Sequence, residues 1–203
     1  MKKTSMALSA GALTLAFALT GCTDTGKSPS QESITPPASS SASTANATEA
    51  DKMFVTMMIP HHEQAVEMSD VLLDKDGADP RVVELAEQIK AAQGPEIDKM
   101  LSWLNDWGVE YDPESMSGMS HGSMDSGDGM MSEEDMTRLE DADPAEANRL
   151  FLEQMIQHHK GAVDMARTAL ADAQNPDVLE LAQQVIDDQT AEIEVMQDLL
   201  EEL

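Results

Sequence analysis

The sequence has few cysteines, few aromatic residues and few basic residues. A single cysteine among 203 residues excludes a disulfide within the chain. Aromatic residues make up only 3%, which disfavours a β-sandwich, because strands prefer rings and β-branched side chains. Lys and Arg number 12 against 39 Asp and Glu, and the net charge of −27 opposes binding to nucleic acid or anionic lipid. The 16 methionines, by contrast, suit a core of packed helices.

The N-terminus has the features of an export signal. Two lysines near the start precede the uncharged stretch Met6–Leu19, which is too short to span a bilayer comfortably. The stretch ends in Leu19-Thr20-Gly21-Cys22, which resembles the lipobox of bacterial lipoproteins, in which the chain is cut before the cysteine that then carries the lipids. We therefore expect a signal peptide over residues 1–21 and lipidation of Cys22, which anchors the protein on the outer face of the cytoplasmic membrane. An ordinary secretory signal with an unrelated cysteine is the alternative.

Residues 22–48 contain mostly Ser, Thr, Ala and Pro and almost no large apolar side chain. Such a segment cannot bury enough surface to offset the entropy of ordering, so we expect a disordered tether behind the lipidated cysteine. Removal of both N-terminal lysines with the signal peptide changes the formal charge to −29. The folded domain is expected over residues 49–203.

An internal duplication organises this domain. Met58–Met68 aligns with Met155–Met165 at a constant offset of 97, and seven of the eleven positions are identical. Each copy has the pattern of a helical hairpin, because Asp79-Pro80 and Asn175-Pro176 each supply a capping residue and a first-turn proline for a second helix. The first helix is expected from about residue 49 to residue 75, after a capping box at Thr48.

The duplication predicts an all-α fold, an antiparallel four-helix bundle. Short turns make the two helices of each hairpin antiparallel, and four amphipathic helices bury their apolar faces most simply as a bundle. The first hairpin is expected over residues 49–108 and the second over residues 143–203. A crossover rich in Met, Gly and Ser, with a short helix after Ser132, joins them over residues 109–142.

Four of the five histidines form two adjacent pairs at equivalent positions of the two copies. Helical periodicity places both pairs and four methionines on the inward faces. Buried imidazoles without partners cost several kcal/mol, about 1–3 each, and a metal ion would satisfy them. Imidazole with thioether selects soft ions, Cu(I) foremost. Hydrogen-bonded core histidines and gap-filling methionines are the alternative. The predicted ligands are His61, His62, His158, His159, Met58, Met155, Met68 and Met165.

Other polar and proline positions lie near the level of these histidines. Gln93 and Gln189 interrupt apolar series on the opposing helices. Two interpretations are open: each glutamine orients an imidazole, or each is a polar residue at the edge of the bundle. Pro60 is expected to kink the first helix, and Pro95 to kink or restart the second. The second copy has Gln157 at the position of Pro60, so the two histidine pairs should have unequal geometries.

The crossover contains a second candidate copper site. A flexible polar segment has no packing use for thioethers, yet this one holds five methionines and the fifth histidine. Low-complexity drift and scavenging of oxidants by methionine are the alternatives. The predicted ligands here are Met116, Met119, His121 and Met124. Met130 and Met131 are the two further methionines of the segment.

The duplicated pattern Met-Ile-x-His-His-x-x-Ala-Val-x-Met resembles the ferritin-like family called domain of unknown function 305, over about residues 50–202. Some members are copper-binding metallochaperone or copper-resistance proteins of the CopM type. The resemblance implies a four-helix bundle and copper binding through the histidine pairs and the methionines at the ends of each motif. Many members have Gly at the position of Gln64, and Gly161 keeps it in the second copy.

These features together predict an exported, membrane-anchored protein that binds copper, as Cu(I), and is not an enzyme. It would act as a chaperone, a buffer or a resistance factor, with a copper-accepting or copper-exporting protein as partner and no nucleic acid. A bundle with a purely structural or partner-binding role is the alternative. A di-iron oxidase needs Glu-x-x-His pairs, and Met58, Ile59, Met155 and Ile156 stand three residues before the histidines instead. A haem protein with His and Met axial ligands does not need duplicated histidine pairs.

Overall fold

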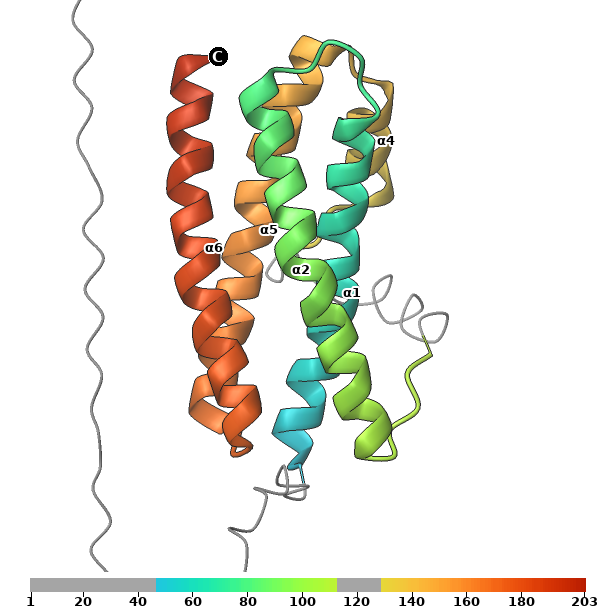
Figure 1. Ribbon diagram of the computed structural model, residues 1–203, viewed down its shortest axis with the longest axis vertical. Helices are drawn as coiled ribbons and strands as arrows, with labels where there is room; N and C mark the ends of the chain where they lie inside the picture. Colours follow the sequence, from blue (N-terminus) through green and yellow to red (C-terminus); the bar gives the residue numbers. More distant parts are fainter. Residues whose placement is uncertain (1–46, 113–128) are drawn as a thin grey trace, which may run out of the picture. The chain divides into compact units, whose positions relative to one another are not determined.

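The structure is a computed structural model that describes residues 47–112 and 129–203. Within these ranges it contains only helices (Figure 1). The helices are α1 (Glu49–Leu73), α2 (Pro80–Asp106), α4 (Glu133–Asp141), α5 (Pro144–Asp172) and α6 (Pro176–Glu202). The predicted all-α four-helix fold is confirmed. Cys22, Met116, Met119, His121 and Met124 lie outside the described residues.

Each long helix begins directly after the residue that the sequence marks as its N-cap. Thr48 and Asp51 form a capping box at the start of α1, with the Thr48 amide donating to the Asp51 carboxylate at 2.7 Å. The N-caps of α2, α5 and α6 are Asp79, Asp143 and Asn175, each followed by proline. A side-chain oxygen at each cap accepts from backbone amides that the first helical turn cannot satisfy, and the proline has no amide to satisfy.

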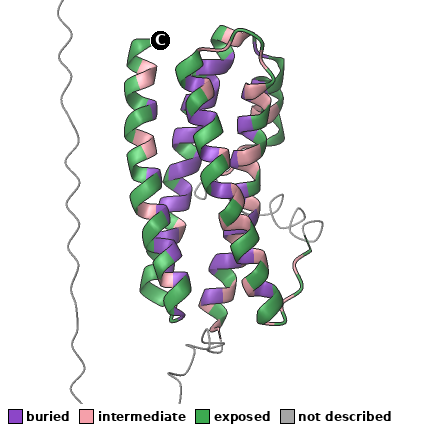
Figure 2. Cartoon of the chain, in the orientation of Figure 1, coloured by how far each residue is buried: buried purple, intermediate pink, exposed green. Residues whose placement is uncertain are grey.

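The two hairpins pack against each other through their first helices. Helix α1 packs on α2, α5 packs on α6, and α1 and α5 run antiparallel along a common seam, with α4 beside both (Figure 1). Arg81 at the start of α2 forms an ion pair with Glu202 at the end of α6. In Figure 2 the buried residues lie on the inward faces of these helices, and the exposed residues cover the outside.

The apolar core has two parts, and every long helix contributes to both. The first cluster includes Ala65, Met68 and Leu72 of α1, Ile89 of α2, Phe151 and Met155 of α5, and Met196 of α6. The second includes Phe54, Met58 and Ile59 of α1, Met100 and Leu104 of α2, Ala162 and Ala166 of α5, and Val178 and Val185 of α6. Between the two clusters, each helix carries polar residues, which we call the central polar layer. It consists of His61, His62, Gln93, Glu96, His158, His159, Gln189 and Glu192.

Both internal prolines lie within continuous helices. Pro60 is inside α1 and Pro95 is inside α2, which runs unbroken from Pro80 to Asp106. We expected either a kink or a restart of the helix at Pro95, and the continuous helix rules out the restart. An internal proline costs a helix about 3 kcal/mol. On either side of Pro95, Ile89 and Met100 are fully buried in different clusters, and this packing supports both halves of α2 as one continuous helix.

Candidate metal centre

The centre of the bundle contains two histidine rings that face each other. His61 of α1 and His158 of α5 are each 1% exposed, and their ring centroids lie 3.8 Å apart with the planes tilted by 41°. The rings meet on the α1–α5 seam, between the two apolar clusters. Neither ring nitrogen of His158 has a hydrogen-bond partner of standard geometry among the described residues. We call His61 and His158 the inner pair.

The surroundings of His158 favour its neutral form. Burial lowers the pKa of His158 well below its ordinary value of 6.5, and the neighbouring His61, His159 and His62 rings lower it further. Only the backbone of His61 acts in the opposite direction. A neutral imidazole retains a nitrogen lone pair, so this side chain is ready to coordinate a metal ion without first losing a proton.

The other two histidines are each held by a carboxylate. His62 Nε2 lies 2.9 Å from Glu96 Oε2, and His159 Nε2 lies 2.6 Å from Glu192 Oε2. With Nε2–H donating to the carboxylate, Nδ1 of each ring carries the lone pair, and neither Nδ1 has a hydrogen-bond partner among the described residues. Metal-binding histidines commonly have this arrangement, in which a carboxylate fixes both the tautomer and the ring orientation.

The carboxylates replace the glutamines that the sequence analysis selected. Among the described residues, both polar atoms of the Gln93 side chain are buried without a hydrogen-bond partner, and so is Oε1 of Gln189. Side chains on a helix lean towards its N-terminus, so Glu96 reaches back to the level of Gln93 and meets His62. The duplication contained the missing signal, because Glu96 and Glu192 are equivalent acidic residues three positions beyond the glutamines.

The methionines next to the histidines occupy different environments. Met58 and Met155 are fully buried one helical turn before His62 and His159. They belong to opposite apolar clusters, so their thioethers flank the central polar layer from its two sides. Met68 is also fully buried in the first cluster.

Met165 departs from the inward position predicted for it. It is half-buried and lines a surface pocket, whereas its equivalent Met68 is fully buried. The neighbouring positions of α5 hold the small residues Ala162, Ala166 and Ala169, which pack into the second cluster. This close packing leaves the longer Met165 side chain at the margin of the seam. Leu170, further along the same helix, is exposed.

Both described ends of the crossover attach to α1 directly after His62. The Tyr111 hydroxyl donates to Glu63 Oε2 at 3.1 Å, and burial together with the Glu63 charge raises the pKa of Tyr111, which keeps it a donor. On the other side, the Gln64 amide donates to the Met131 carbonyl at 2.9 Å and accepts from the Met131 amide at 2.7 Å. Gln64, whose equivalent in the second copy is Gly161, is therefore a two-bond anchor for the returning chain.

Gly129 shows how closely this returning chain approaches α5. Its φ is +77°, and a Cβ atom at this position would lie 2.5 Å from the Gln157 carbonyl oxygen and 3.0 Å from that of His158. The same Cβ would lie 3.0 Å from Cα of Gly161, which is itself without a side chain. Residues 129–131 thus run across the seam at the level of the central polar layer.

A family model for a domain of unknown function, DUF305, matches residues 51–200. The chain belongs to the DUF305 family. This confirms the resemblance found in the duplicated motif.

Solved structures similar to this DUF305 chain share its fold. A DUF305 fragment from Deinococcus radiodurans is 32% identical with a TM-score of 0.66, and the match covers 77% of this chain and 99% of that one. A DUF305 protein from Streptomyces coelicolor, assigned as secreted, is 32% identical with a TM-score of 0.67 over 75% and 93% of the two chains. CopM in its Cu(I)-bound form is 30% identical with a TM-score of 0.60 over 75% and 96%. CopM has also been solved with Cu(II) and with Ag. No protein of curated function matches the chain.

The central polar layer of this DUF305 protein offers imidazoles and thioethers rather than a cluster of carboxylates. In residues 47–112 and 129–203, no group of three or more His, Cys, Asp or Glu side chains is placed to hold a metal ion together. The layer instead contains two facing rings, two carboxylate-held rings and two flanking thioethers. Neutral nitrogen and sulfur donors are the ligands that soft ions prefer. No helix in the described part is long and apolar enough to cross a membrane.

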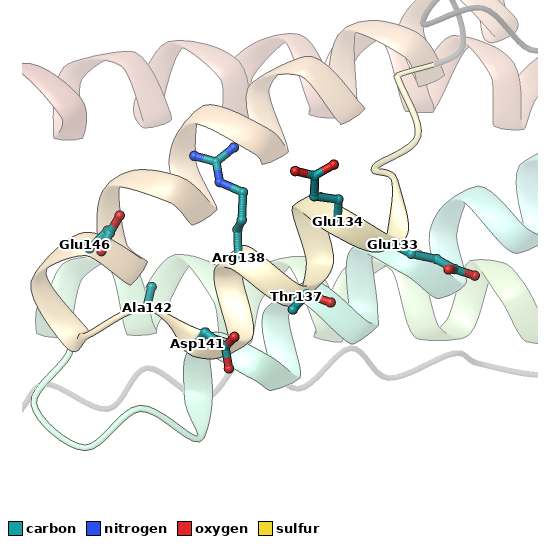
Figure 3. A pocket seen from close by; sticks show the side chains of 7 residues that line it. All are labelled: Glu133, Glu134, Thr137, Arg138, Asp141, Ala142 and Glu146. Carbon is teal, nitrogen blue, oxygen red and sulfur yellow. The ribbon is translucent and has the colours of Figure 1, made fainter.

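A larger surface hollow of about 540 Å³ lies on α4 and the start of α5, away from the histidines. Its lining includes the carboxylates of Glu133, Glu134, Asp141 and Glu146 and the guanidinium of Arg138. Figure 3 shows that these side chains point in different directions and do not converge on one point. The hollow is a solvated acidic surface of this DUF305 domain and does not resemble a binding site.

Proposed function

We propose that this DUF305 protein binds copper as Cu(I) in the central polar layer and carries or buffers it outside the cytoplasm. The observation that supports the proposal best is the inner pair, because both ring nitrogens of His158 are buried without a hydrogen-bond partner of standard geometry among the described residues. An unsatisfied buried polar group costs about 1–3 kcal/mol, and coordination of His158 to a metal ion would recover that cost. Cu(I) suits this position because it accepts few ligands and prefers neutral imidazole and thioether donors.

The remaining residues of the layer support the same ion. Glu96 and Glu192 already accept hydrogen bonds from His62 and His159, so they act as orienting groups rather than as ligands. Met58 and Met155 contribute soft donors from opposite sides of the layer. A hard divalent ion needs six or more oxygen ligands, which the layer does not offer.

Similarity to proteins of known metal content supports the choice of ion. CopM, which shares this fold at 30% identity, has been crystallised with Cu(I) bound. The site in this protein is built from residues of both copies of the duplication, so copper binding uses the whole bundle. We assign the protein a role in copper homeostasis without catalysis, as a chaperone, buffer or resistance factor.

The proposed location rests on the N-terminal sequence. The lipobox-like Leu19-Thr20-Gly21-Cys22 supports lipid anchoring through Cys22 on the outer face of the cytoplasmic membrane. The secreted assignment of the Streptomyces coelicolor relative agrees with export. A copper-accepting or copper-exporting protein at the same membrane would be the partner, and the charge of −27 argues against nucleic acid.

An anaerobic Cu(I) titration of the purified protein against a competing chelator tests the proposal. Replacing His61 and His158 together by Ala should weaken the tightest binding at least tenfold, about 1.4 kcal/mol. His121→Ala is the matched control, because it removes the only histidine outside the bundle motif and should leave the tight site unchanged. Equal affinity of the double variant and the parent would refute the assignment of the inner pair.

A further inference from the structure

A second group of thioethers lies on the surface of the α1–α5 seam. A pocket of about 190 Å³ opens there, and three of its eight lining residues are methionines, Met53 and Met57 of α1 and Met165 of α5. Met53 and Met57 are one helical turn apart and therefore share a face of α1. Met165 reaches the same pocket from the opposite helix. None of the three belongs to the fully buried core.

Packing does not explain the exposure of Met53 and Met57, which belong to neither apolar cluster, whereas Met165 packs at the edge of the second cluster. Met53 is 64% exposed, the highest value among the exposed large apolar residues of the described part, and Met57 and Met165 are half-buried. A methionine side chain that stays in water buries little apolar surface and is not fixed by a packing contact. Its thioether, however, remains available to a solute. Single exposed apolar residues are common on protein surfaces, but three thioethers that line one pocket form a group.

The walls of the pocket favour a soft cation over a hard one. Apart from the methionines, the lining is formed by small or apolar residues such as Phe54 and Ala169, with the oxygens of Thr168 and Asp172 as its polar groups. Two such groups cannot replace the oxygen ligands that Mg²⁺ or Ca²⁺ needs. Thioethers select Cu(I) and similar ions, and the flexible methionine side chain lets sulfur atoms converge with little strain. The negative charge of the chain raises the local concentration of any cation.

The register of the two helices connects this pocket to the inner pair. His61 faces His158 on antiparallel helices. Met57 precedes His61 by four residues, and Met165 follows His158 by seven, so both methionines lie on the same side of the pair. At 1.5 Å per residue these separations along the helix axes are about 6 Å and about 10 Å. Met58, the next residue after Met57, is fully buried beside the layer.

We propose that Met53, Met57 and Met165 form a surface binding site for a monovalent soft metal ion, Cu(I) or Ag(I), from which the ion passes along the α1–α5 seam to the inner pair. The binding part stands on the pocket alone, and the transfer part rests on the proposed function of the central polar layer. Transfer is an exchange of neutral ligands, thioether for imidazole, so no electron or proton has to be supplied. The pocket is shallow and open, so it captures an ion faster but holds it less tightly than the buried layer.

Silver ion, which does not change oxidation state in air, is the probe that tests this site. Purified protein carrying ¹³C-methyl methionine is titrated with Ag(I), and the methyl resonances are assigned by single Met→Leu changes, which keep side-chain volume. The key variant is His61→Ala with His158→Ala, which removes the inner pair and leaves the pocket. Its Met53, Met57 and Met165 resonances should still shift with Ag(I), while the Met136 resonance on α4 should not.

The triple variant Met53→Leu, Met57→Leu and Met165→Leu tests transfer. It should slow loading of the inner pair at least tenfold while leaving the final affinity of that site unchanged. Absence of Ag(I)-induced shifts at the three pocket methyls in the His61/His158 variant would overturn the pocket site. Loading of the triple variant at the parental rate would overturn transfer. If the pocket methyls shift but the double histidine change leaves the tight affinity intact, the pocket stands and the proposed function of the inner pair fails.

Discussion

His62 and His159 are each held by one carboxylate and each keep a buried ring nitrogen without a hydrogen-bond partner among the described residues. At the scale of single residues, each of these two rings thus has a fixed orientation and a nitrogen lone pair that can coordinate a metal ion. This combination makes the carboxylates, and not the neighbouring glutamines, the positions to test.

Glu96→Ala should lower Cu(I) affinity by roughly 10- to 100-fold, because removing the partner of a ligating imidazole frees its ring to rotate and change tautomer. A chelator competition at fixed pH measures the change. Gln93→Leu is the control: its amide makes no hydrogen bond among the described residues, so affinity should be unchanged and stability equal or greater. Equal losses in both variants would assign the orienting role to the amide as well.

Stability of the copper-free protein should depend on the protonation of His158. Burial, followed by the neighbouring imidazoles, lowers the pKa of His158 in the folded state, so below about pH 6.5 the unfolded chain binds a proton that the folded chain excludes. Stability contributed by the neutral ring is therefore present above pH 6.5 and lost as pH falls towards the lowered value. We expect a loss of about 1 kcal/mol between pH 6.5 and pH 5.5 in urea unfolding.

His158→Leu is the matched variant for this measurement, because it removes the titrating group and keeps an apolar side chain on the seam. Its stability should change less over the same pH interval than that of the parent. The imidazoles of His61, His62 and His159, which lower the pKa of His158, remain in the variant. An identical pH profile for both proteins would show that His158 does not control it.

At the scale of helices, Asp51 joins elements that are distant in sequence. Its carboxylate accepts from the Thr48 amide and hydroxyl at the start of α1 and from the amides of Gln174 and Asn175 in the α5–α6 turn, at 3.0 and 2.9 Å. Burial alone would raise the pKa of Asp51, but these hydrogen bonds outweigh it and lower the pKa. One buried side chain therefore caps α1 and fixes the second hairpin to the first.

Asp51→Ala should destabilise the protein by about 2 kcal/mol, since it removes a cap and leaves the amides of Gln174 and of the buried Asn175 without this acceptor. Asp79→Ala, which removes an exposed cap of α2, should cost about 1 kcal/mol or less. Denaturant unfolding at neutral pH compares them. Because the pKa of Asp51 is lowered, the difference in destabilisation between the two variants should shrink as acid protonates the Asp51 carboxylate. An equal destabilisation by the two changes at neutral pH would contradict the bridging role.

Gln64 is the corresponding anchor for the crossover. Gln64→Ala removes both hydrogen bonds to Met131, so the Met131 amide should exchange with solvent faster, and the free energy of unfolding should fall by about 1 kcal/mol. Amide hydrogen exchange followed by mass spectrometry measures the first effect. Gln183→Ala, which loses only an exposed side-chain contact on α6, should leave Met131 protected. Unchanged protection in Gln64→Ala would mean that other contacts, such as those of Gly129, hold this segment.

The helices were predictable because their signals are local. Caps and prolines gave the start of each long helix, and the first helix, expected to end near residue 75, ends at Leu73. The inward direction of all four histidines also followed from periodicity alone. Three features could not be predicted from periodicity: the hydrogen bond of Glu96, the anchors Gln64 and Tyr111, and the outward position of Met165. Each depends on how far a side chain reaches across a helix pair. Sequence spacing does not encode that reach.

At the scale of the whole molecule, the central polar layer divides one core into two apolar clusters that share all four long helices. Neither cluster is complete without every helix, so unfolding should be a single cooperative transition. Copper bound only in the folded layer should raise the midpoint of that transition. At a free Cu(I) concentration one hundred times Kd, the added stability is about 2.7 kcal/mol.

Thermal or urea unfolding of the protein with and without Cu(I) measures this added stability under anaerobic conditions. The His61→Ala, His158→Ala variant should gain much less at the same free ion concentration. A second, separate transition on copper removal would show that the two halves of the core unfold independently, contrary to the shared-helix arrangement.

His61 and His158 occupy equivalent positions in the two copies of the repeat, so the inner pair is the kind of contact that a two-fold axis creates between identical subunits. One hairpin alone contains half of such a pair. The geometry is therefore that of a homodimer whose two subunits have become one chain. Fusion released each half from the need to match the other: one carries Gln64 as an anchor where the other carries Gly161, and one buries Met68 where the other turns Met165 outward. A dimer of identical hairpins could acquire none of these differences, because every substitution would appear on both sides of its axis.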